Sequence, residues 1–202
     1  MPISMQRTLT TSRLRDNRHT NRIPNWFLMS DVSRMADPSQ MVPQLPANSA
    51  VIIRDPDPQK AQDHAVRIRP LCRKYGVLVL LACPEPPSRL VCDGVHIPER
   101  ALSNWRRIDL QRLGPALVTT SAHSQRAIQR AARFGADGVL VSPVFPTNSH
   151  PGASILGYMR FTGMAKQADL AVIALGGIQT SNIRRILLSD AHGIAGISLF
   201  SE

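Results

Sequence analysis

Eight short apolar runs recur along this chain of 202 residues, each followed by a helical or polar segment. The runs consist of Val, Ile, Leu and Ala with little alternation, which is typical of parallel strands covered on both faces. They span residues 26–29, 51–53, 77–82, 94–97, 116–119, 138–141, 171–175 and 194–197. A chain built this way is constrained to an α/β fold with a parallel sheet.

The helical segments between these runs vary in quality. The clearest runs from Ser124, a natural N-cap, to Gly135, a natural terminator. Its apolar stripe is expected to contain Ala127, Ile128, Ala131 and Ala132. Other connections, such as "MADPSQMVPQLP" and "CPEPPSRLVC", carry too many prolines for long helices.

Two further helices are predicted. One opens at Asp57 and ends at Gly76, and Pro70 inside it is expected to kink or shorten it. The other covers residues 182–188 and is capped by one residue of the Thr-Ser pair that precedes it.

Eight strands alternating with helices admit two architectures. A closed eight-stranded parallel βα (TIM) barrel uses each strand once, whereas a doubly wound open sheet usually needs fewer strands. No G-x-G-x-x-G motif follows the first run, which counts against a dinucleotide-binding sheet. The sequence therefore predicts one compact TIM-barrel domain over residues 24–202, with some short or degenerate outer helices, after a basic, disordered tail over residues 1–23.

Composition limits the partners. The formal charge is +10, but the arginines are dispersed over the tail and the outward faces of predicted helices, so solvated surfaces are favoured and no nucleic-acid partner is expected. A tail-based nucleic-acid hypothesis stays open. The three cysteines match no metal or redox spacing and predict reduced thiols in a cytoplasmic protein. No membrane span, secretory signal or zinc site is expected.

The paired glycines Gly176 and Gly177 stand between the seventh run and the next helix. In a βα barrel, the loops after the seventh and eighth strands commonly bind phosphate through backbone N–H groups. Glycine permits the close approach that such a site needs. The structural alternative is a tight turn that requires positive φ. The segment "GISLF" lies at the end of the eighth run, where the second phosphate-binding loop is expected, and this placement favours the phosphate site.

Several segments together resemble one family. "TTSAHS", "GADGVLVSPVFPTNSHPGASILG", "VIALGGIQTSNI" and "GIAGIS", in this order and spacing, are similar to thiamine phosphate synthase and its thiazole tautomerase relatives. The earlier "FLMSD", "VIIRD" and "CDGVHIP" fit the same family's first, second and fourth strands. The resemblance covers residues 25–200 and is strongest over the last 90 or so.

The resemblance implies a TIM-barrel transferase of thiamine biosynthesis. The synthase joins a pyrimidine methyl diphosphate to a thiazole phosphate and releases diphosphate. Such a reaction needs stabilisation of a departing anion more than a nucleophile. By position, the thiazole phosphate is expected to meet Gly176, Gly177, Ile197, Ser198, Thr147 and Ser149, while Ser121 and Arg54 match residues near the diphosphate.

The sequence departs from the family at the diphosphate end. Ala82-Cys83 stands where the family has Asn-Asp, whose aspartate holds Mg²⁺. The second metal aspartate is missing from "HIPERA". Mg²⁺ prefers oxygen ligands, so its binding is doubtful, and Glu85 and Glu99 are the weak substitutes.

Four hypotheses follow. The first is a divergent synthase in which Arg54, His150 and Arg100 replace part of the metal's role. The second is a tautomerase-like isomerase that uses only the thiazole phosphate, with His123 as acid and base. The third is a non-catalytic binder of a phosphorylated metabolite, and the fourth is nucleic-acid binding by the tail. A homodimer is left open.

Overall fold

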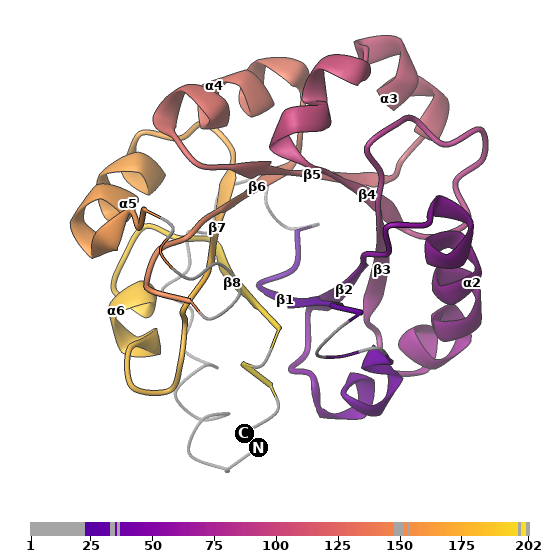
Figure 1. The fold of residues 1–202 in the computed structure, drawn as a ribbon, viewed down its shortest axis with the longest axis horizontal. Helices are drawn as coiled ribbons and strands as arrows, with labels where there is room; N and C mark the ends of the chain where they lie inside the picture. The colour runs from indigo at the N-terminus through magenta and orange to yellow at the C-terminus, as the bar shows by residue number, and fades with distance from the viewer. Residues whose placement is uncertain are drawn as a thin grey trace.

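The computed structural model describes residues 23–32, 35, 37–147, 152, 154–197 and 199–200. Eight parallel strands form a closed barrel in which each strand pairs with the next and β8 pairs with β1. Figure 1 shows the helices around the outside of this ring, with the chain passing in order from β1 to β8. The predicted TIM barrel is confirmed. The predicted tail lies outside the described residues up to position 22, and the next residue, Ile23, is already buried.

The strands agree closely with the eight apolar runs. They are β1 (Trp26–Met29), β2 (Ser49–Ile53), β3 (Leu78–Ala82), β4 (Gly94–Ile97), β5 (Leu117–Ala122), β6 (Gly138–Val141), β7 (Ala171–Leu175) and β8 (Gly193–Gly196). The largest difference is in β5, which continues through Ser121 to Ala122 beyond the predicted end at residue 119. Its last residues are polar or small, and neighbouring strands hold them in the ladder.

The outer helices are of unequal length. Among the described residues, five are α-helical: α2 (Pro58–Lys74), α3 (Arg107–Leu113), α4 (Gln125–Phe134), α5 (Gly157–Lys166) and α6 (Ile183–Leu187). Two short 3-10 turns, η1 (Pro38–Gln40) and η2 (Val42–Gln44), stand in the proline-rich connection between β1 and β2, and a third, η3 (Glu99–Asn104), precedes α3. The expectation of short and degenerate outer helices is confirmed. No helix among the described residues meets the length and apolarity of a bilayer span.

The helix predictions are confirmed in part. Ser124 caps α4 by accepting a hydrogen bond from the Ala127 N–H at 3.2 Å, and Gly135 ends it in the left-handed conformation. Pro70 does not shorten α2, because it lies on the exposed face, where water can solvate the carbonyl that loses its partner. The N-cap of α6 is Asn182, not the Thr-Ser pair before it.

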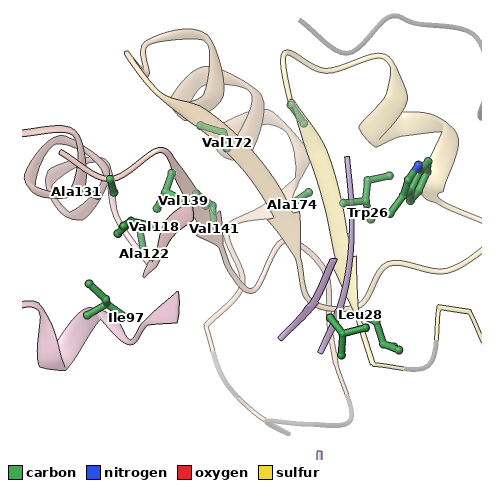
Figure 2. Close-up of a cluster of buried hydrophobic side chains, with 14 of the residues drawn as sticks. Trp26, Leu28, Ile97, Val118, Ala122, Ala131, Val139, Val141, Val172 and Ala174 are labelled. Carbon is green, nitrogen blue, oxygen red and sulfur yellow. The ribbon is translucent and has the colours of Figure 1, made fainter. Parts of the chain in front are cut away.

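Side chains from alternate strand positions form two apolar layers. Outward-facing residues pack beneath the helices in the larger cluster, part of which Figure 2 shows with Leu28, Val118, Val139 and Val172 labelled. Inward-facing residues fill the barrel itself, among them Phe27, Ile52, Leu80, Leu140 and Ile173. The barrel is therefore a packed core, and ligands have access only at its ends.

Close approach of β4 and β5 generates the first prediction. A Cβ on Gly94 would overlap the Leu117 backbone carbonyl, so Gly94→Ala is expected to lower the free energy of unfolding by about 1–3 kcal/mol. Gly163, inside α5, has no atom within 4 Å of such a Cβ, and Gly163→Ala is expected to raise stability by about 0.5–1 kcal/mol. Urea unfolding of both variants checks this. Equal effects would contradict the close approach.

Candidate active site at the carboxyl end of the barrel

The carboxyl ends of the eight parallel strands meet at one rim of the barrel, where active sites of this architecture lie. The predicted residues on this rim that the structure describes follow β2 (Arg54), β4 (Glu99), β5 (His123), β6 (Thr147), β7 (Gly176 and Gly177) and β8 (Ile197), with Ser121 inside the end of β5 and Glu85 after β3. The other predicted residues, Ser149, His150 and Ser198, lie outside the described part of the chain. The fold thus brings the described set to one end.

Gly176 and Gly177 pack directly against the loop after β6. Both have positive φ, at 94° and 66°, and a Cβ on either would clash with Pro143 or with the Phe145–Pro146 backbone. The Gly176 carbonyl accepts a hydrogen bond from the Phe145 N–H at 3.1 Å. The tight-turn requirement is therefore real, and it is compatible with a phosphate site, because the bond uses a carbonyl.

Asn182 fixes the other side of the same turn. Its Nδ2 donates to the Gly177 carbonyl at 2.8 Å, and its Oδ1 accepts from the Gln179 N–H at 3.0 Å. No pattern in the sequence predicts these two contacts of Asn182. Together with the Gly176 contact, they use the carbonyl oxygens of both glycines.

Arg54 is tied to the end of β1. Its Nε donates to the Ser30 carbonyl at 2.9 Å, and its guanidinium lies 3.4 Å from an Asp31 carboxylate oxygen. The side chain remains 39% exposed, so the guanidinium still has access to a ligand from solvent. Arg54 is thus paired with Asp31, which lies 23 positions earlier in the chain.

His123 is oriented by two fixed contacts. Its Nδ1 lies 2.7 Å from the Ser142 carbonyl, an acceptor only, so this nitrogen carries the proton and the neutral ring has its lone pair on Nε2. Its backbone N–H donates to Glu99 Oε2 at 2.9 Å. His123 does not cap α4, since Ser124 does so.

A cavity of about 700 Å³ opens beside β4 and β5, between η3 and α4. Ser121 and His123 join it to the rim. Its other lining residues are Pro98, Glu99, Arg100, Leu102, Ser103, Arg130, Arg133 and Phe134. The glycine pair and Arg54 do not line it, so the predicted site residues divide between this cavity, the end of β2 and the end of β7.

His96, on β4, is a buried polar residue inside the apolar barrel. It is 3% exposed, and its ring nitrogens lie 3.0 Å from Thr119 Oγ1 and 2.9 Å from Ser121 Oγ. Burial, with a smaller contribution from the positive charge of Arg54, lowers its pKa to about 3. The signal available in the sequence was the period of two that places residues 96, 119 and 121 inside the barrel.

The residues present do not fit a Mg²⁺ site. Burial, with a smaller contribution from Cys92, raises the pKa of the Cys83 thiol to about 12, so it stays protonated at neutral pH. Glu85 accepts from Asn104 Nδ2 at 2.7 Å, and Glu99 pairs with Arg130 at 2.9 Å. The described ranges contain no cluster of three or more His, Cys, Asp or Glu side chains. Hard oxygen ligands are therefore not gathered for this ion.

Comparison with known proteins defines the class as a thiamine phosphate synthase-type transferase. The family model described as thiamine monophosphate synthase matches residues 41–200. The chain therefore belongs to the thiamine monophosphate synthase family, as its motifs predicted, and the expected transferase class in thiamine biosynthesis is confirmed.

Two relatives of similar sequence are named as thiamine-phosphate synthases. "Putative thiamine-phosphate synthase 2" of Aquifex aeolicus is 36% identical over 140 residues, covering 68% of this chain and 74% of that protein. The thiamine-phosphate synthase of Geobacillus thermodenitrificans is 30% identical over 145 residues, covering 68% of this chain and 63% of the relative's length. Thiamine phosphate pyrophosphorylase from Pyrococcus furiosus superimposes with a TM-score of 0.69 at 21% identity, over 90% of this chain and 88% of that one, and shows the shared fold.

The lowered pKa of His96 generates a prediction about acid stability. The unfolded chain binds a proton at this ring near its ordinary pKa of 6.5, whereas the native state does so only near pH 3. Between these values the unfolded state holds more protons, so stability falls as pH falls, by up to about 1.4 kcal/mol per pH unit. His96→Gln is expected to remove this part of the slope. Urea unfolding between pH 7 and pH 5 measures it, and an unchanged slope would contradict the buried neutral imidazole.

Proposed function

We propose that this chain joins a pyrimidine methyl diphosphate to a thiazole phosphate, with diphosphate as the leaving group. The observation that supports this most directly is the membership of the family, combined with anion-compatible groups at opposite parts of one rim. Polar and cationic side chains surround the β2, β4 and β5 ends, while the glycine turn lies after β7. Two separated anion sites are what a reaction between two phosphorylated substrates requires.

The thiazole phosphate is assigned to the turn after β7 and the chain after β8. The carbonyl oxygens of Gly176 and Gly177 are engaged by Phe145 and Asn182, which orients the peptide groups of this turn. Backbone N–H groups at Gly177 and Ile197 then serve as donors to phosphate oxygens, as N–H groups of turns commonly do. Thr147, Ser149 and Ser198 complete this assignment as hydroxyl donors.

The diphosphate is assigned to the opposite part of the rim. Arg54 offers a half-exposed guanidinium whose orientation is held by Ser30 and Asp31. A guanidinium binds phosphoryl oxygens with two parallel donors and stabilises the charge that develops as diphosphate leaves. Ser121 adds a hydroxyl, and Arg100 and His150 are the further cations of this assignment. No step is given to Mg²⁺, because the residues do not fit it.

An isomerase acting on a thiazole carboxylate phosphate is the second candidate. One observation favours it: the Ser142 carbonyl holds the Nδ1 proton of His123, leaving the Nε2 lone pair of a cavity-lining ring available as a base. The named relatives are synthases, so they give this alternative no added weight.

The synthase assignment predicts that Arg54 is needed for turnover. Arg54→Ala is expected to lower kcat/KM about 100-fold or more, because a donor to the departing anion is lost. Thiamine phosphate formation from the two substrates is the measurement. Arg73→Ala, an exposed arginine near the end of α2, is the matched control and is expected to leave the rate unchanged. Turnover of thiazole carboxylate phosphate alone, lost in His123→Ala, would instead establish the isomerase.

The phosphate assignment predicts weaker binding of thiazole phosphate when the hydrogen bonds that hold the glycine turn are lost. Asn182→Ala removes both contacts that orient the turn and is expected to weaken thiazole phosphate binding about tenfold. Titration calorimetry measures this affinity. Ser181→Ala, at the exposed neighbouring position, is the control. Equal affinities of the two variants for thiazole phosphate would contradict the assignment of the phosphate to this turn.

A further inference from the structure

The buried ring of His96 links the barrel interior to the rim. It lies on β4 at an inward position, where most neighbours are apolar, and both its nitrogens face hydroxyl groups of β5. Thr119 is fully buried below it, and Ser121 lies one inward position closer to the rim and lines the cavity. The three side chains form a continuous polar line from the core to the candidate site.

The ring is neutral at physiological pH, because burial and the nearby positive charge of Arg54 oppose protonation. A neutral imidazole has one N–H donor and one lone-pair acceptor. The two hydroxyls must therefore take opposite roles. Whichever hydroxyl donates to the ring, the other accepts from it.

Two arrangements satisfy the ring, and they have different consequences for Ser121. If Nδ1 carries the proton, Ser121 gives its hydroxyl proton to Nε2 and presents only lone pairs to the rim. If Nε2 carries the proton, Ser121 accepts from the ring and keeps its own proton for a ligand. An anion at the rim is attracted by the second arrangement and repelled by the first.

A bound anion selects the second arrangement. The Thr119 hydroxyl oxygen lies 3.0 Å from His96 Nδ1 and 3.4 Å from the Val95 carbonyl, so its proton has two possible acceptors. The Ser121 hydroxyl has one proton. When that proton goes to a phosphoryl oxygen, the 2.9 Å contact between Ser121 Oγ and the ring is a hydrogen bond donated by Nε2–H, and Thr119 donates to Nδ1.

From this geometry we infer that His96 is a positioning residue: its Nε2–H, with Thr119 donating to Nδ1, holds Ser121 as a hydrogen-bond donor to a phosphoryl oxygen at the rim. The inference rests on the proposed function for the identity of the substrate, although it applies to any diphosphate group bound there. The chain of donors runs from Thr119 through His96 to Ser121 and ends on the anion. Such aligned chains strengthen each hydrogen bond in turn.

Nitrogen NMR of the full chain tests the tautomer directly. Long-range proton–nitrogen correlations of labelled histidine distinguish Nε2–H from Nδ1–H, and Ser121→Ala assists the assignment of the His96 signals. The expected result is the Nε2–H form in the complex with inorganic pyrophosphate, which is the probe. An Nδ1–H form in the pyrophosphate complex would overturn the inference.

A double-mutant cycle tests the route through Ser121. His96→Asn and Ser121→Ala are each expected to weaken pyrophosphate binding about tenfold, and their combination no further, because both remove the same hydrogen bond. His96→Gln restores an amide donor near the Nε2 position and is expected to recover most of the affinity. Additive losses, or failure of glutamine to rescue while the variant stays folded, would show a structural role only.

The same binding measurements include a control variant, and their outcome does not depend on the proposed reaction. Thr120→Val lies on the outward face of β5, where the buried hydroxyl has no partner among the described residues, and is expected to leave affinity unchanged. Because pyrophosphate binding and the tautomer are read without turnover, absence of synthase activity alone would overturn the proposed reaction and not this inference. If the His96 variants fail to fold, the tautomer of the wild-type His96 ring in the pyrophosphate complex tests the inference by itself.

Discussion

Closure of the strand ring between β8 and β1 is the constraint on which the rest of the structure depends. Asn25 connects three strands at this point: its backbone carbonyl accepts from Ile194, its Nδ2 donates to the His192 carbonyl, and its Oδ1 accepts from Asn48. Gly193 has no space for a Cβ, which would lie 2.6 Å from the Asn25 carbonyl. Because all eight strands are parallel, their carboxyl ends lie at one rim, and closure between β8 and β1 makes the segments after β8 and after β1 and β2 close neighbours there.

The proposed function uses two chemically different ways to bind an anion at this rim. After β7 the groups that remain for a ligand belong to the backbone, because the carbonyls of the glycine pair are engaged. Beside β4 and β5 they are side chains, held by a buried polar line inside an apolar barrel. Burying His96 and Thr119 is costly unless each is hydrogen-bonded, and both are. The inferred role of this line is to connect these two buried groups to Ser121 at the rim.

Much of this could be predicted from the sequence, for reasons that are local. The apolar runs identified all eight strands, and Ser124 and Gly135 defined α4, because strand burial and helix capping act over a few residues. The end of β5 was missed because Ser121 is polar and its place in the strand depends on β6. The neutral state of His96 depends on burial and on Arg54, 42 positions earlier, and no local pattern encodes that proximity.

The carboxylates at the rim explain why side-chain donors and cations, rather than a protein-held metal, suit this site. Asp31 lies against Arg54, Glu85 against Asn104, and Glu99 against Arg130 and the His123 amide. Each of these carboxylates is held by a neighbouring donor, and the described residues contain no group of three or more His, Cys, Asp or Glu side chains that could hold a metal ion. The negative charges of Asp31 and Glu99 are in addition partly compensated by arginines. In the proposed reaction, these two ion pairs lower the electrostatic cost of bringing anionic substrates to the rim.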